Sequence, residues 1–240
     1  MTLGRAGSLL AVVIGPLAWC IALGLLVGGD PMLAIEVGGG VLVLAWAALV
    51  VREIVASHRV ARALAVDADA IDLFGVPCLV TPRLGADALV VGAFRPRIFV
   101  GSSLIGALSD EELEAVVYHE DHHRRARAPL RAAALGGWLR LLGRSEGVRT
   151  AVGDRLADLE TLADTDAIRR GSSPRSLARA LLKGDLSHEP VAFSYAADRR
   201  IARLLDHGPE TPAAASAQLP YEWLPITALA AVLIACHIAL

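Results

Sequence analysis

The chain has 240 residues with a formal net charge of −2, and 55% of its residues are hydrophobic. Because the charge is close to neutral, no global electrostatic feature suggests nucleic-acid binding, and we exclude nucleic acid as a partner. The hydrophobic fraction and the mean hydropathy of +0.52 are high for a soluble domain and indicate a membrane protein.

Two apolar segments near the N-terminus are long enough to cross a bilayer. Residues 6–29 contain no charged side chain, and residues 32–51 carry only Glu36. A hydrocarbon core of about 30 Å requires roughly 20 helical residues, so both segments are predicted to span it. A signal peptide is the alternative for the first segment, but a second apolar run follows at once. Residues 1–51 are therefore predicted to form a transmembrane helical hairpin.

The region after the second span is predicted to be α+β. Residues 52–70 resemble a basic, alanine-rich helical extension of the span. Short runs rich in Val, Leu and Ile predict strands at residues 76–81, 88–92 and 97–100. A small antiparallel sheet is the economical arrangement. A peptide could add to its exposed edge as a further strand, although the strands could equally serve only to pack on a helix.

A helix is predicted to begin at Ser109. Ser109 and Glu112 have the spacing of a capping box, and acidic residues crowd the first turn. Leu113, Val116 and Val117 recur at helical spacing, and Pro129 marks a stop or a kink.

This helix carries His119-Glu120-Asp121-His122-His123, which contains the pattern His-Glu-x-x-His. Positions i and i+4 of a helix share a face, so His119 and His123 can bind one metal ion. Glu120 would lie beside the metal, where it can take a proton from a water molecule. A charged, solvated helix face is the alternative reading of the pattern alone.

A catalytic metal needs a third protein ligand, which a helix predicted at residues 154–169 can supply. Glu160 and Asp164 lie four positions apart and share a face of that helix. Glu160 can bind the metal, and Asp164 can hold a ligand histidine in the required tautomer. Without the motif helix, an acidic surface helix would be the better interpretation.

The other segments are predicted mainly as helices and linkers. Residues 130–142 are apolar but include Arg131 and Arg140, which favours a helix at the membrane surface or inside the domain. The further predictions are a connector at 144–153, a basic amphipathic helix at 172–183, a helix at 192–205 and a linker at 208–219.

Residues 223–240 are apolar apart from His237 and follow Tyr221, which can anchor at the interface together with Trp223. We predict a C-terminal transmembrane helix there, with a core or interfacial helix as the alternative. The predicted domains are thus a hairpin at 1–51, a zinc domain at 52–212, and a linker with a final span at 213–240.

Basic residues predict the orientation. Every Lys and Arg except Arg5 lies between Arg52 and Arg203, so the positive-inside rule places the large domain in the cytoplasm of a multi-pass membrane protein. Cys20, Cys78 and Cys236 form no plausible disulfide framework, which agrees with a reducing compartment.

The paired motifs His119-Glu120-x-x-His123 and Glu160-x-x-Ala163-Asp164 resemble the gluzincin arrangement of integral-membrane metallopeptidases. Two families share it, M56 (the BlaR1 type) and M48 (the HtpX and Ste24 type), and the likeness favours M56. The similarity extends to residues 88–100 upstream and to 193–205 downstream, and covers roughly residues 75–206.

The resemblance implies a mostly helical, minigluzincin-like domain with a small sheet and a bound Zn²⁺. By this likeness His119, His123 and Glu160 are zinc ligands, Glu120 is the general base and Asp164 orients a ligand.

The expected function is a membrane-embedded zinc endopeptidase that cleaves cytoplasmic or membrane proteins, with a transcriptional repressor as the substrate type implied by M56. The alternative is a non-catalytic zinc-binding membrane regulator that binds a cytoplasmic partner. A transporter is disfavoured because the three spans contain only Glu36 and His237 as ionisable residues.

The sequence departs from both families at Asp121 and His122, where an apolar and a small residue are usual. Asp121 is expected either to add negative charge near the site or to face water. His122 is expected to be a bystander, because only His119 and His123 combine i, i+4 spacing with Glu120 between them. Tyr195 and Arg200 are candidates for stabilising an oxyanion, from residue type alone.

Overall fold

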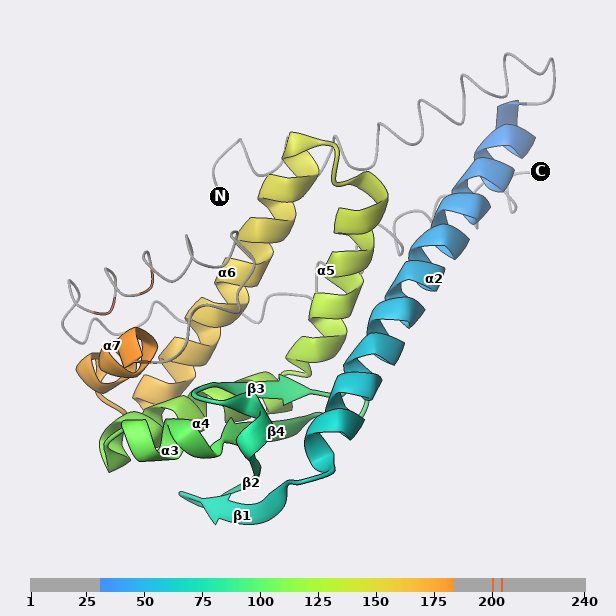
Figure 1. Cartoon of the computed structure of the whole chain (residues 1–240). Helices are drawn as coiled ribbons and strands as arrows, with labels where there is room; N and C mark the ends of the chain where they lie inside the picture. Colours follow the sequence, from blue (N-terminus) through green and yellow to red (C-terminus); the bar gives the residue numbers. More distant parts are fainter. Residues whose placement is uncertain (1–30, 184–199, 201–203, 205–240) are drawn as a thin grey trace. The chain divides into compact units, whose positions relative to one another are not determined.

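The computed structural model describes residues 31–183 together with Arg200 and Leu204 (Figure 1). The spans expected at 6–29 and 223–240, the linker at 208–219 and Tyr195 lie outside the described residues. The described part is α+β, mostly helical, with one small mixed sheet. The described residues divide into two compact units, one with residues 31–53 and 133–154 and the other with residues 54–132 and 155–183.

Helix α2 (Pro31–Ala65) contains the second apolar segment and most of its predicted extension as one continuous helix. Its stretch Val37–Ala65 is long and apolar enough to cross a membrane, and it is the single such stretch in the described part of the chain. At 1.5 Å per residue, the 35 residues of α2 reach about 52 Å, well beyond a hydrocarbon core of about 30 Å.

Within the first unit, α2 packs against helix α5 (Ala128–Leu142), which confirms the helix expected at 130–142. The Trp46 indole donates to the carbonyl of Ala134 at 3.1 Å, and its ring centroid lies 5.6 Å from that of Trp138. The Arg140 guanidinium lies 2.7 Å from the Glu53 carboxylate, so one of the two arginines that interrupt the apolar run forms an ion pair with α2.

The second unit is built on a four-stranded sheet with the order β1-β2-β4-β3. The strands are β1 (Asp69–Leu73), β2 (Val76–Thr81), β3 (Ala88–Val91) and β4 (Arg97–Gly101), with a short 3-10 helix, η1 (Pro82–Leu84), after β2. Strand β1 pairs with β2 and β3 with β4 in antiparallel fashion, whereas β2 and β4 are parallel.

The parallel pair corrects the antiparallel sheet expected from sequence. After β2 the chain passes through η1 to the sheet edge, forms β3, and returns through a tight turn so that β4 inserts between β3 and β2. Gly92 in that turn has φ of +104°, and a Cβ atom there would lie 2.7 Å from the Arg95 carbonyl oxygen. Only glycine satisfies both conditions without strain.

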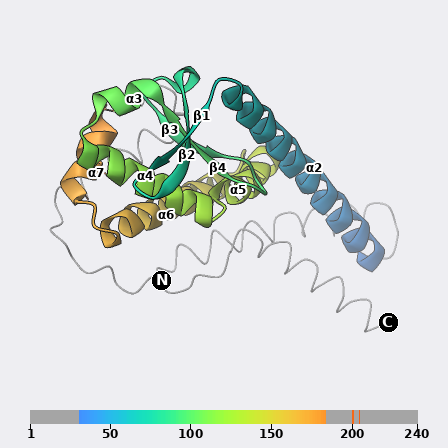
Figure 2. The same cartoon turned by 90° about the horizontal axis from the view of Figure 1, so that it is seen from below.

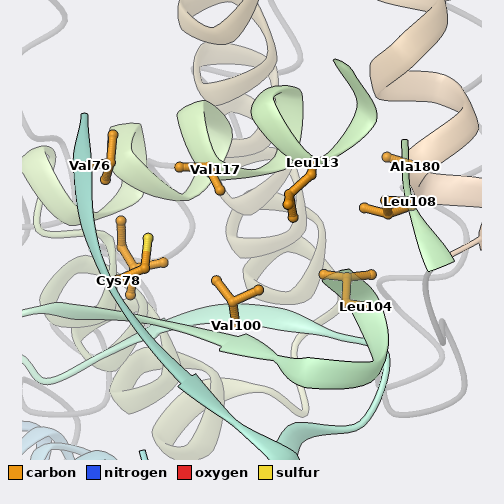
Figure 3. Packing of buried hydrophobic residues seen from close by; sticks show 9 residues of the cluster. Val76, Cys78, Val100, Leu104, Leu108, Leu113, Val117 and Ala180 are labelled. Carbon is orange, nitrogen blue, oxygen red and sulfur yellow. The ribbon is translucent and has the colours of Figure 1, made fainter. Parts of the chain in front are cut away.

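Strand β4 is buried on both faces. Side chains alternate along a strand, so Ile98 and Val100 face one side and Phe99 the other. The first side packs against helix α4 (Asp110–Arg125), where Leu113 and Val117 point toward the sheet (Figure 3). On the opposite face, Phe99 packs against the C-terminal end of α2.

Four helices complete the described elements: α3 (Ser102–Ala107), α4, α6 (Glu146–Arg169) and α7 (Pro174–Lys183). Helix α7 lies beside α4, and Ala180 joins the same core as Leu113 (Figures 1 and 2). The start of α7 at Pro174 confirms the predicted helix at 172–183.

Two boundary predictions were wrong. The helix expected at 52–70 ends at Ala65, and the chain forms β1 from Asp69. The connector expected at 144–153 belongs largely to α6, which begins at Glu146.

Candidate metal centre

Helix α4 starts as the sequence predicts. The Ser109 hydroxyl accepts from the Glu112 backbone N–H at 3.4 Å, and the Glu112 carboxylate accepts from the Ser109 N–H at 2.9 Å. This capping box and the burial of Leu113 and Val117 against the sheet fix the rotation of the helix. In its third and fourth turns, α4 carries His119 and His123, which are 6% and 9% exposed.

The two histidines meet Glu160, which projects from α6. His119 Nε2 lies 3.0 Å from His123 Nε2. The two carboxylate oxygens of Glu160 lie 3.4 Å from His119 Nε2 and 3.3 Å from His123 Nε2. These three residues form a group that could hold a metal ion, as their spacing in the sequence predicts.

Asp164 lies one turn further along α6, on the far side of the His119 ring. Its Oδ1 atom is 3.0 Å from His119 Nδ1, and its side chain is fully buried. A carboxylate at Nδ1 favours the tautomer that carries its proton there and leaves Nε2 free as a ligand atom. Asp164 therefore occupies the place expected for a residue that orients His119.

Arg200 binds both acidic residues of α6. Its guanidinium donates to Glu160 Oε2 at 2.7 Å and to the two carboxylate oxygens of Asp164 at 2.7 and 3.1 Å. The side chain is 13% exposed. Residue type suggested only an oxyanion role for Arg200, whereas the structure shows it fixing the carboxylates behind the histidines. No local pattern could predict this contact, because 36 positions separate Arg200 from Asp164.

The carboxylates around His119 favour positive charge on its ring. Burial alone would lower the pKa of His119, but the carboxylates of Asp164 and Glu160 raise it to about 10. Burial would raise the pKa of Glu160, yet hydrogen bonds from His119 and His123 hold it well below its usual range. In the same way, the pKa of Asp164 falls to about 2, mainly because of His119 despite burial. The carboxylates thus stabilise positive charge where the ligand atoms converge.

Glu120 differs from the other carboxylates. It is half-buried, and burial raises its pKa even though the charges of His123 and His119 oppose the shift. The carboxyl group of Asp87, just before β3, raises this pKa further. A carboxylate with a raised pKa is a stronger base, which suits a residue that must accept a proton.

Asp121 is buried, which corrects the expectation that it faces water, and it is not among the three residues of the ligand group. It is 5% exposed, and its carboxylate accepts hydrogen bonds from Arg124, Arg125 and Arg170. His122 is turned toward Asp166, with 3.7 Å between Nδ1 and Oδ2, and it does not belong to the ligand group.

Comparisons of the chain with models of protein families, with curated proteins and with solved structures gave no match. The similarity to the M56 and M48 peptidases consequently stays a prediction from the motifs.

Proposed function

We propose that the protein is a zinc-dependent endopeptidase associated with a membrane. The observation that supports this most directly is that possible ligand atoms of His119, His123 and Glu160 converge, all lying within 4.8 Å of one another. Zinc bonds of about 2.0–2.2 Å in a tetrahedral site require ligand atoms about 3.3–3.6 Å apart. The distances from His119 and His123 to Glu160, 3.4 and 3.3 Å, match this spacing, whereas the two Nε2 atoms, 3.0 Å apart, would have to separate by a few tenths of an ångström around the ion.

The donor set also favours zinc over calcium or magnesium. Imidazole nitrogens with a single carboxylate suit Zn²⁺, whereas the harder ions prefer oxygen ligands. Three protein ligands are typical of a catalytic site, because a structural zinc takes four. When bound, zinc would act as a Lewis acid that makes a water molecule more acidic and polarises a substrate carbonyl.

The chain's own residues then perform the proton transfers. A carboxylate oxygen of Glu120 takes the proton from the attacking water, and the raised pKa of this residue makes the transfer easier. The same carboxylic acid returns the proton to the leaving amine. Asp164 and Arg200 keep His119 and Glu160 in place throughout, so the ligands need no rearrangement during the reaction.

Strand β3 offers a place for the substrate. It lies at an edge of the sheet with β4 as its single sheet neighbour, and it packs against α4. An extended peptide can pair with such an edge through main-chain hydrogen bonds, which would lay its backbone next to the motif helix. This mode of binding accounts for peptide substrates without requiring a particular side chain.

Helix α2 supports a location at a membrane, since it holds the long apolar stretch Val37–Ala65. A multi-pass arrangement with the metal centre in the cytoplasm follows from the distribution of Lys and Arg in the sequence and belongs to the proposal. A cytoplasmic or membrane protein, including a repressor, is then the substrate.

The test compares wild type with Glu120→Gln. Each full-length protein is purified in detergent, its zinc content is measured, and cleavage of an unfolded protein mixture is followed by mass spectrometry. Both proteins should bind zinc, and the substitution should lower the cleavage rate at least 100-fold, at the lower end of general-base effects of about 10²–10⁴. Equal cleavage rates in the two proteins would refute the mechanism.

The matched control is Glu111→Gln, which changes an exposed acid in the first turn of the same helix. It should cleave at the wild-type rate. Stoichiometric zinc binding by wild type without cleavage of any cytoplasmic protein would instead favour the non-catalytic regulator. Proteomics of native membranes carrying wild type or Glu120→Gln would identify the substrates.

A further inference from the structure

Asp121 lies on the side of α4 opposite the metal ligands. Successive residues of an α-helix are about 100° apart, so a residue two positions from both His119 and His123 points about 160° away from each. Asp121 thus lies between His119 and His123 in the sequence but on another face of the helix. The carboxylate is buried, and nothing in the proposed reaction uses it.

Guanidinium groups occupy every acceptor position of this carboxylate. Arg124 donates twice to Oδ1, at 2.9 and 2.7 Å. Arg125 and Arg170 donate to Oδ2 at 3.0 and 2.7 Å. A carboxylate offers about four lone-pair sites, so Asp121 is saturated and cannot also bind a metal. We call this group the Asp121 cluster; it comprises Asp121, Arg124, Arg125 and Arg170. Its hydrogen bonds hold protein elements together and leave no acceptor for a metal.

The cluster connects α4 to the end of α6. Arg170 follows the last residue of α6, and its guanidinium carbon lies 3.8 Å from the centroid of the Tyr118 ring on α4. From there its Nη1 atom reaches Asp121. Arg125 makes a second connection, since it donates to Asp121 and, at 2.5 Å, to Asp166 of α6.

Hydrogen bonds at the end of α6 hold the backbone of Arg170 in a defined position. Gly171 has φ of +112°, its N–H donates to the Ile168 carbonyl at 3.0 Å, and the Ser172 N–H donates to the Ala167 carbonyl at 3.1 Å. These are the two hydrogen bonds of a Schellman motif, which ends a helix in a defined geometry. The Arg170 side chain consequently extends from a fixed backbone position at the end of the helix that carries Glu160 and Asp164.

We propose that Asp121 is a positioning residue for the metal centre: through Arg170 it prevents α4 from rotating about its axis, so that His119 and His123 face Glu160. Helix α4 is held on one side by the contacts of the histidines to α6 and on the other by the Asp121 cluster. A metal site requires its ligands to be held within about 0.5 Å and 10–20° of their working geometry. The inference rests on the proposed metal site but not on proteolysis.

The experiment measures metal binding by the full-length protein in detergent. The variants are Asp121→Asn, which removes the charge, and Arg170→Lys, which keeps a charge but loses the planar group stacked on Tyr118. The control is Asp67→Asn, because Asp67 forms an ion pair with Arg83 at about half exposure and away from α4. Zinc affinity is measured by competition with a coloured chelator, and ligand geometry by the visible absorption of bound Co²⁺.

Asp121→Asn should bind zinc about 10–100-fold more weakly, as for other residues that orient metal ligands, and its Co²⁺ spectrum should change. Arg170→Lys should show a smaller change in both quantities, and Asp67→Asn should match wild type. A role in folding alone would lower the melting temperature of the metal-free protein and leave the Co²⁺ spectrum unchanged.

Wild-type affinity and spectrum in folded Asp121→Asn would overturn the proposal. If Asp121→Asn does not fold, Arg170→Lys provides the test. A wild-type zinc affinity and Co²⁺ spectrum in Arg170→Lys would then overturn the proposal. A wild-type protein that binds zinc but cleaves no peptide would contradict the proposed function and leave this comparison valid.

Discussion

His119 Nδ1 lies 3.0 Å from Oδ1 of Asp164, a residue with no exposed surface. The contact joins α4 to α6 behind the possible ligand atoms, so Asp164 can orient His119 in the candidate metal centre without being one of the three residues of the group. An imidazole has two nitrogens, and a carboxylate at one of them determines which is left to bind a metal. The position of Asp164 therefore matters as much to the chemistry of His119 as the ligand spacing does.

Replacing Asp164 by Asn tests this relationship. The amide cannot stabilise positive charge on the ring, and it permits the wrong tautomer. We expect zinc affinity to fall about 10–100-fold, measured by chelator competition on the full-length protein. Asp158→Asn is the control, because Asp158 lies on the same helix and pairs with Arg155 at 3.1 Å rather than with a histidine. Equal loss in both variants would show that Asp164 has no special role.

Arg200→Met should destabilise the protein strongly. The substitution leaves Glu160 and the fully buried Asp164 without the guanidinium that both accept from. Removing one partner of a buried charge pair costs about 3–5 kcal/mol, which urea unfolding can resolve. Bound zinc should offset part of this loss, because it supplies positive charge beside Glu160. The difference between variant and wild type should thus be smaller with zinc than with chelator; a difference unaffected by zinc would contradict this account.

Each half of the ligand group was predictable from local spacing, whereas the pairing of Glu160 with the histidines rested on the resemblance to the gluzincin arrangement. His119 and His123 are one helical turn apart, as are Glu160 and Asp164, and helical geometry brings each pair to one face. The capping box at Ser109 and Glu112 could also be predicted from the sequence, because both of its hydrogen bonds join residues three positions apart. Such features depend on neighbours in the sequence and not on the fold.

Other features depend on contacts that the sequence does not reveal. Arg200 reaches the site across 36 positions, and Arg170 reaches Asp121 across 49. The parallel pairing of β2 with β4 arises from the path of the chain through β3, which strand patterns cannot specify. Strand β1 was missed because four of its five residues are exposed, so it has no buried face that a run of apolar residues would mark.

Phe99→Ala should test how the end of α2 is held to the sheet. Phe99 is fully buried and packs against Ala61 and Leu64 of α2. Truncating a buried phenylalanine costs about 3–5 kcal/mol through lost burial and the remaining cavity. Phe94→Ala is the control, since Phe94 is 63% exposed and should change the free energy of unfolding by less than about 0.5 kcal/mol. Similar effects of the two changes would argue against this packing.

Lys183→Met should make stability less dependent on acid pH. Lys183 Nζ lies 2.7 Å from Glu112 Oε2, and this hydrogen bond, with that from Ser109, lowers the pKa of Glu112 from its usual value of 4.5. A lowered folded-state pKa stabilises the protein above pH 4.5 and ceases to do so as the pH falls through the folded value. Lys183 is half-exposed, so solvent screening keeps the effect modest.

Urea unfolding of wild type and Lys183→Met at a series of pH values checks this. At pH 7 wild type should be the more stable, and the difference should shrink as the pH falls from 4.5 through the lowered pKa of Glu112, below which Glu112 is protonated in both proteins. Salt should reduce the difference at pH 7, because half-exposed charges are screened. A difference that stays constant from pH 7 to pH 3 would instead indicate that the lysine stem stabilises α7 by packing and that its charge contributes nothing.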